Sequence, residues 1–161
     1  MRRVFSKGEA VVYPMHGAGV IEEFEEKTID GIKKNYYVLF LPLGGLKVML
    51  PSDCIQKSGL RPILHESEIE GVLKKMSDAP SPMRIDSWSE RYKENVDKMK
   101  SGKLCQAASV YYELFHKEKL KGLSSAEKKV MTTAKKIVLS EIMLGFDVEK
   151  NAAEDVLNQY L

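Results

Sequence analysis

A change of hydrophobic periodicity near residue 60 divides this chain into a β-patterned part and a helix-patterned part. Up to about residue 58, short runs of β-branched and aromatic residues end at glycine or proline, which is typical of short strands. Beyond residue 66, apolar residues recur every three or four positions, which is typical of amphipathic helices. A chain of 161 residues can hold two small domains. We therefore expect an α+β protein with domains at residues 1–62 and 63–161.

The N-terminal part contains four predicted strands and signals for the turns between them. The strands are expected just before Pro14 and over residues 17–26, 34–41 and 46–51. Asp30 and Gly31 mark a hairpin turn, and a short piece around Cys54 is expected to close the sheet. So few residues must curl on themselves to bury enough apolar surface, which predicts a small SH3- or Tudor-like β-barrel.

The C-terminal part is predicted to be a compact bundle of about five helices. Capping boxes, in which a serine and a glutamate three positions later satisfy free backbone N–H groups, are expected at Ser67, Ser87 and Ser124. Two prolines within residues 77–83 separate the first helix from the second. Gly102 and Gly122 are expected to end the second and the third helix.

Composition argues against a membrane protein, a metalloprotein and an enzyme. The apolar runs are far shorter than a membrane span, and the first residues lack a signal-peptide core, so we expect a cytoplasmic protein. Two cysteines and three scattered histidines form no metal-ligand cluster, so we expect neither a metal nor a cofactor. Phosphate-binding glycine loops are missing from the sequence, and His16 is better explained as a turn or surface residue than as a general base.

Positive charge is concentrated in the middle of the helical part. The formal net charge is only +2, yet residues 84–136 hold 13 lysines and arginines against 7 aspartates and glutamates. The last stretch, residues 137–161, holds 1 against 5. This distribution favours an anionic partner for one region of the bundle.

The single tryptophan, Trp88, stands at the expected start of a helix and is followed by Arg91 and Lys93. An aromatic ring flanked by cations suits a DNA minor-groove wedge, because the cations hold phosphates while the ring stacks on bases. A second interpretation is that Trp88 is a core residue of a protein-only adaptor. Acidic residues such as Glu90 weaken a purely electrostatic argument for DNA binding.

Three motifs, in this order and spacing, make the whole chain resemble the CarD family of bacterial RNA-polymerase-binding regulators, including its CdnL-like branch. They are FSKGEAVVYPMHGAG at residues 5–19, WSERYKEN at residues 88–95 and GLSSAEK at residues 122–128. The resemblance implies a Tudor-like domain that binds the lobe of the polymerase β subunit, as in the transcription-repair coupling factor. It also implies a helical domain that contacts promoter DNA without sequence specificity at the upstream edge of the bubble.

The family pattern implies roles for individual residues of this chain. Trp88 matches the tryptophan that enters the minor groove and slows bubble collapse. The cations expected near DNA are Arg91, Lys93 and Lys128. Lys27, Lys47 and Met49 fall in the segments that face polymerase in relatives. The chain departs from some relatives at Glu90 and at Met49, where those relatives have basic residues. We expect a monomer that reaches the nucleoid through polymerase.

Overall fold

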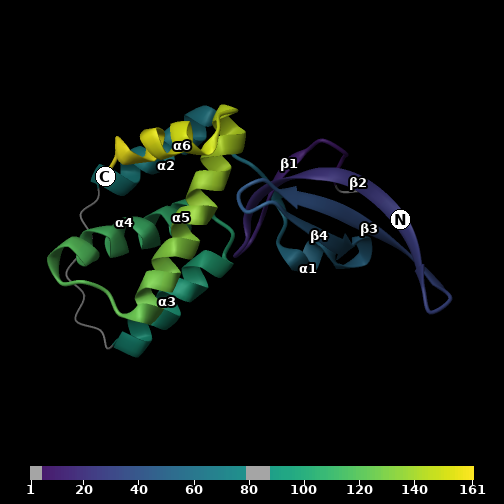
Figure 1. Ribbon diagram of the computed structural model, residues 1–161, viewed down its shortest axis with the longest axis horizontal. Helices are drawn as coiled ribbons and strands as arrows, with labels where there is room; N and C mark the ends of the chain where they lie inside the picture. Colours follow the sequence, from purple (N-terminus) through teal and green to yellow (C-terminus); the bar gives the residue numbers. More distant parts are fainter. Residues whose placement is uncertain (1–4, 79–87) are drawn as a thin grey trace.

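The computed structural model describes residues 5–78 and 88–161 and places a sheet and a group of helices side by side along its long axis (Figure 1). The strands of the described residues are β1 (Ala10–Tyr13), β2 (Gly17–Ile29), β3 (Ile32–Leu41), β4 (Leu46–Pro51) and β5 (Arg61–Pro62). Neighbouring strands are antiparallel, in the order β4-β3-β2-β1-β5. The α+β class is therefore as predicted.

The sheet is open, so the predicted closed barrel is not confirmed. Within the described residues β4 pairs with β3 and β5 pairs with β1, and no pairing joins β4 to β5. The strand expected at Cys54 and Ile55 is wrong, because helical turns η1 (Ser52–Cys54) and α1 (Ile55–Ser58) occupy that segment. Ile55 reaches the sheet core from this short helix with 2% of its surface exposed, so no strand is needed to bury it.

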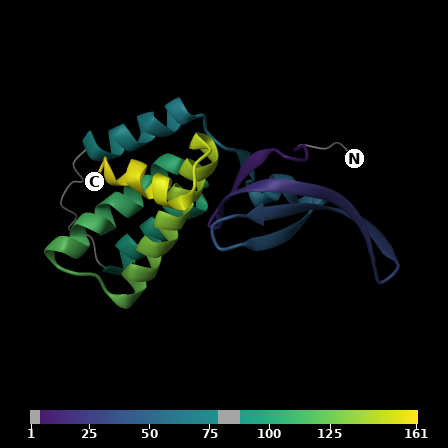
Figure 2. The same cartoon turned by 45° about the horizontal axis from the view of Figure 1, so that its top comes forward.

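Strands β2 and β3 are longer than predicted and form a projecting ribbon, residues 26–35. Asp30 and Gly31 have φ of +53° and +77°, as a two-residue hairpin turn requires, and Ile29 pairs with Ile32 across it. Pairing with β4 stops at Tyr36, so the ribbon is paired only within itself among the described residues. Both views show it pointing away from the helices (Figures 1 and 2).

Five helices follow β5 in the described part of the chain, in agreement with the predicted bundle of about five. They are α2 (Glu66–Asp78), α3 (Trp88–Lys100), α4 (Leu104–Leu120), α5 (Ser125–Phe146) and α6 (Lys150–Asn158). Gly102 and Gly122 both have positive φ after helix ends, as predicted for C-terminal stops.

The three predicted capping boxes have different outcomes. At Ser124 the box is confirmed, since the Glu127 N–H donates to Ser124 Oγ at 3.2 Å and the Glu127 carboxylate reaches back to the Ser124 N–H. At Ser67 the prediction is wrong: α2 begins at Glu66, and the Glu68 carboxylate accepts the His65 N–H. Ser87 lies outside the described residues.

Two apolar cores stabilise the two parts of the chain. The sheet core includes Val11, Ile21 and Leu39, each 0% exposed. The larger core lies among helices α2 to α6 and includes fully buried Val138 and Ile142 of α5. Full burial of each such side chain contributes about 1.5–3 kcal/mol. These cores hold the outer sheet face and the helix ends in place as platforms for surface residues.

Candidate functional site

The outer face of the sheet, opposite its core, brings together the three residues predicted to bind polymerase. Met49 lies opposite Val38 in the β3–β4 ladder, and Lys47 lies opposite Phe40, so both side chains project from one face. Lys27 belongs to the same face of β2, and its Nζ lies 3.6 Å from Met49 Sδ. Met49 remains 38% exposed. Two cations and a thioether thus form a single exposed surface.

The same face is bordered by β4, an outermost strand of the described sheet. β4 is the first strand of the sheet order and has β3 as its partner among the described residues, so its other backbone edge faces outward. Lys47 is anchored there by an ion pair with Glu22, with 3.2 Å between Nζ and Oε2. Such an edge can accept a strand from another protein.

The residues predicted to contact DNA lie on α3 and α5. Trp88 is the first residue of α3, but its side chain lies outside the described residues, so the two interpretations of this ring stay open. Arg91 is half-buried and Lys93 exposed on the first turns of α3, and Lys128 is exposed on the first turn of α5. The two helices are in contact, and their N-terminal ends lie at the same end of the bundle (Figures 1 and 2).

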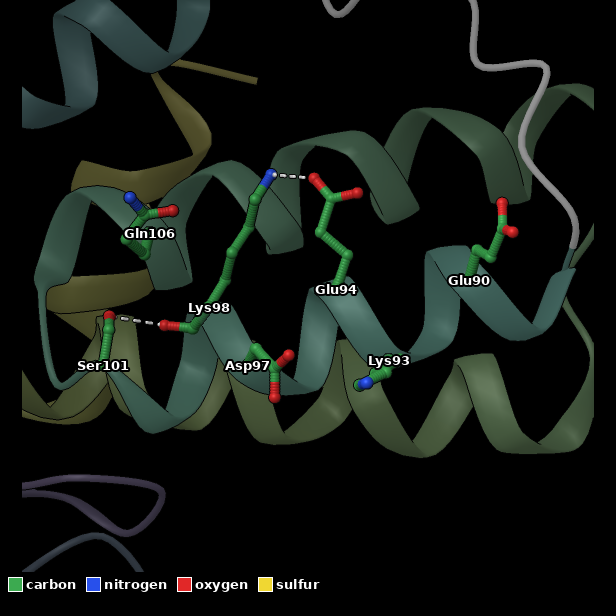
Figure 3. Close-up of a pocket in the computed structure, with 7 residues that line it drawn as sticks. All are labelled: Glu90, Lys93, Glu94, Asp97, Lys98, Ser101 and Gln106. Atoms are coloured by element: carbon green, nitrogen blue, oxygen red, sulfur yellow. Dashed lines mark hydrogen bonds and ion pairs between the residues drawn. The ribbon is translucent and has the colours of Figure 1, made fainter.

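One side of α3 lines a polar groove whose charge is mostly negative (Figure 3). Lys93 lies there among Glu90, Glu94 and Asp97. Lys98 is paired with Glu94 at 3.5 Å, so it offers little positive charge to a ligand. Glu94 is neutralised by the same pair, so Lys93 shares the groove with the carboxylates of Glu90 and Asp97, which disfavour a phosphate there.

The start of α5 is fixed by a partly buried ion pair that the sequence analysis did not predict. Lys117 Nζ of α4 lies 2.8 Å from Glu127 Oε2 of α5. Burial alone would raise the pKa of Glu127, but the Lys117 ammonium and the Ser124 hydrogen bonds together hold this pKa below its ordinary value. The pair places Lys128, the next residue, at the end of the bundle.

The tyrosine–proline–histidine–glycine motif of residues 13–17 lies where the sheet meets the helices. Met15 packs against the helical core, while His16 is exposed with its ring stacked on Tyr13 at 4.6 Å. His16 is therefore a turn and surface residue, as expected. The motif's apolar residues attach the sheet to the bundle.

Family models match both parts of the chain. Residues 5–64 match the model described as "CarD-like/TRCF RID domain", and residues 71–158 match the model described as "CarD, C-terminal domain". The chain belongs to the CarD family. The "Putative transcription factor YdeB" of Bacillus subtilis (strain 168) is 35% identical over 139 residues, which cover 86% of this chain and 90% of that protein.

The family predicted from three motifs is thus confirmed, and both groups of predicted site residues fall within the matched ranges. The sheet residues lie in the first range, and the residues of α3 and α5 lie in the second. The helices of the described residues include none long and apolar enough to cross a membrane. Among the same residues, no group of three or more histidines, cysteines, aspartates or glutamates could hold a metal ion.

Sequence reasoning missed the polar residues that join the two parts of this CarD protein, namely Arg61, Ser140 and Glu141. A usable signal was present: Ser140 and Glu141 interrupt an apolar run that extends from Ile137 to Ile142 in α5. A carboxylate buried at such a position strongly destabilises the fold unless it is paired. The partner, however, is 80 residues away along the chain, so the sequence alone did not identify it.

Proposed function

We propose that this CarD-family protein is a transcription regulator that binds RNA polymerase and promoter DNA at the same time. Residues 1–62 bind the β-subunit lobe, and residues 63–161 contact DNA at the upstream edge of the bubble, which stabilises the open complex. The model matching residues 5–64 is named for a CarD-like/TRCF RID domain, and the Bacillus relative is named a transcription factor, which supports this assignment.

The observation that carries the polymerase contact is the clustering of Lys27, Lys47 and Met49 on one exposed sheet face beside an open strand edge. A strand from the partner can extend the sheet at β4 through backbone hydrogen bonds. The two lysines then favour an acidic partner surface, and Met49 adapts to apolar partner side chains.

The proposed DNA contact uses the shared end of α3 and α5. Trp88 is the wedge, placed at the positive end of the α3 dipole, and unstacking a base step would cost on the order of a few kcal/mol. Arg91 and Lys128 hold the phosphates on either side. Lys93 contributes least because of the acidic groove around it.

Tethering explains how a chain of net charge +2 can act on DNA. Polymerase binding raises the local concentration of the bundle at one promoter position, to about millimolar for a short connection. Specificity for occupied promoters then comes from polymerase and not from base contacts.

Charge reversal on the sheet face tests the polymerase contact. We expect Lys47→Glu to weaken binding of the full chain to the isolated β lobe at least tenfold, or about 1.4 kcal/mol. Lys33→Glu is the matched control, since Lys33 is also exposed but lies on the opposite face of the ribbon, opposite Thr28. Equal losses for both variants, or no loss for Lys47→Glu, would contradict the proposed surface.

Removing the indole tests the DNA contact. We expect Trp88→Ala to shorten the open-complex lifetime in a purified transcription assay while binding to the β lobe persists. If Trp88 is instead a core residue of an adaptor, the same change should destabilise the bundle by about 3–5 kcal/mol. Tryptophan fluorescence separates the two cases, since a core indole emits at shorter wavelength and is protected from quenchers.

A further inference from the structure

A single arginine of the sheet holds three separate segments at the junction with the bundle. Arg61 of β5 donates from Nη2 to Glu141 Oε1 at 2.7 Å and from Nη1 to Glu141 Oε2 at 2.9 Å. Its Nε donates to the carbonyl of Gly102, in the turn between α3 and α4, at 2.6 Å. All three guanidinium nitrogens thus donate hydrogen bonds, which join β5 to α5 and to the turn between α3 and α4.

The hydrogen bonds to the buried Glu141 carboxylate depend on this orientation of the sheet. Its side chain is 0% exposed, and Oε2 also accepts the N–H of Leu64, in the connection after β5, at 2.9 Å. The hydrogen-bond donors to this carboxylate, Arg61 and Leu64, therefore lie in the chain segment 61–64, while Glu141 itself belongs to α5. If the sheet rotated relative to the bundle, a buried carboxylate would lose these donors.

A second contact, independent of charge, lies at the start of β2. The Ala18 N–H donates to Ser140 Oγ at 2.8 Å, and this hydroxyl donates in turn to the Ile137 carbonyl at 2.8 Å. The neighbouring Gly17 has no space for a side chain, because a Cβ there would lie 2.7 Å from Ser140 Oγ. The sheet backbone therefore lies directly against α5.

We infer that Arg61 and Glu141 are positioning residues that lock the sheet and the bundle into one orientation. This inference rests on the proposed function, because it concerns how the two proposed surfaces act together. A short bidentate ion pair is directional, and a buried one strongly resists losing a partner. The lock fixes the distance and orientation of the α3–α5 end relative to the sheet face that binds polymerase. The DNA contact therefore falls at a set distance from the polymerase contact.

Loss of the lock should affect the proposed polymerase contact and the proposed DNA contact differently. If the two parts could move freely, each would keep its own binding surface, but the bundle would sample many positions and its effective concentration at the DNA would fall. Loss of the lock should therefore separate two activities: binding to the β lobe persists, while the effect on the open complex declines.

Residual dipolar couplings of backbone amides in the full chain test the orientation directly. In the unaltered protein, couplings from β1–β4 and from α2–α6 should fit one alignment tensor of equal magnitude. In Glu141→Gln, which keeps the shape but loses the charge, the two tensors should differ in magnitude. Different tensors in the unaltered protein would overturn the inference and leave the proposed function intact.

Glu127→Gln is the matched control, because it breaks a partly buried ion pair inside the bundle and not across the junction. In this variant, the couplings from the sheet and from the bundle should still fit one common alignment tensor. Arg61→Lys is the second junction variant: it keeps the cation but cannot make the fork, and it should also separate the tensors, less than Glu141→Gln does.

The functional measurement uses the same variants. We expect Glu141→Gln to bind the β lobe as the unaltered protein does, yet to reduce the extension of open-complex lifetime roughly tenfold as effective concentration falls. If the alignment tensors of the two parts differ in Glu141→Gln but the open-complex lifetime is unchanged, a fixed orientation is not needed for the effect on DNA, and the inference is wrong. An unaltered protein that neither binds the lobe nor changes the lifetime would instead defeat the proposed function. Parallel loss of both activities in Glu141→Gln would show that the pair is merely structural.

Discussion

The junction and the ribbon use charged residues in opposite ways. At the junction, Arg61 and Glu141 are bonded to each other and to backbone, and Glu141 has no exposed surface. On the ribbon, Lys27 lies directly opposite Lys34, and Ile29 and Ile32 at the tip are 55% and 58% exposed. Like charges directly across a ladder disfavour it. The ribbon therefore presents two lysines side by side and an exposed apolar tip.

This difference separates residues that fix the shape of the molecule from residues that are available to a partner. Satisfied and buried polar groups favour one orientation of the two parts. Exposed groups on the sheet face contribute little to folding, so their effect should appear in binding. Substitutions at the two regions should accordingly have different effects on stability.

The largest difference is expected from removing one charge in each region. Glu141→Ala leaves Arg61 without its partner and should lower the free energy of unfolding by about 3 kcal/mol, the low end for a buried pair. The low end applies because the Arg61 side chain keeps 24% exposure. Lys34→Ala on the ribbon should change stability by no more than about 0.5 kcal/mol. Urea denaturation measures both, and similar losses would remove the distinction between the regions.

A smaller difference is expected from adding one methyl group in each region. Gly17 has φ of +104° and faces Ser140, so Gly17→Ala adds both strain and a collision and should cost about 2–3 kcal/mol. Gly31 has φ of +77° with nothing within 4 Å of a Cβ, so Gly31→Ala should cost only the strain, about 1 kcal/mol. Thermal unfolding compares the two. A Gly31 variant as unstable as the Gly17 variant would show that the ribbon also packs tightly.

Local chemistry explains which parts of the fold could be predicted from the sequence. The hairpin turn at Asp30 and Gly31 and the capping box at Ser124 depend on residues close together in the chain, and both predictions were confirmed. The ends of β2 and β3 were underestimated, because polar residues beyond Glu26 continue a ladder without any core. The closed barrel was expected from size alone, and strand composition does not determine whether two sheet edges meet.

The candidate site was predictable only in part, for a similar physical reason. The family resemblance implied a polymerase-facing role for Lys27, Lys47 and Met49, and the structure places them together on one face. The lock between Arg61 and Glu141 depends on two residues distant in sequence, and no local pattern identifies Arg61 as the partner of Glu141. Packing decides such pairs, and periodicity reports only that Glu141 lies in a buried stretch.

The smallest difference between buried and surface charges should appear in the titration of individual carboxyl groups. Burial opposes ionisation of Glu127, yet Lys117 and Ser124 outweigh it and lower the pKa below 4.5. On the sheet face, a hydrogen bond with Glu23 raises the pKa of half-buried Glu25 above 4.5, with the cations Lys27 and Lys47 opposing the shift. Carbon-13 NMR of the side-chain carboxyls should therefore show Glu127 titrating at lower pH than Glu25.

The lowered pKa of Glu127 predicts how the stability of the fold changes with pH. Because the folded state binds the Glu127 proton less tightly than the unfolded state, the ion pair stabilises the fold fully above pH 4.5 and less as pH falls through the lower folded-state pKa. Glu127→Gln should remove this contribution, so its unfolding free energy should fall less steeply than that of the unaltered protein below pH 4.5. Parallel acid profiles would mean that the Lys117–Glu127 pair does not hold the start of α5, and that Lys128 is positioned by packing alone.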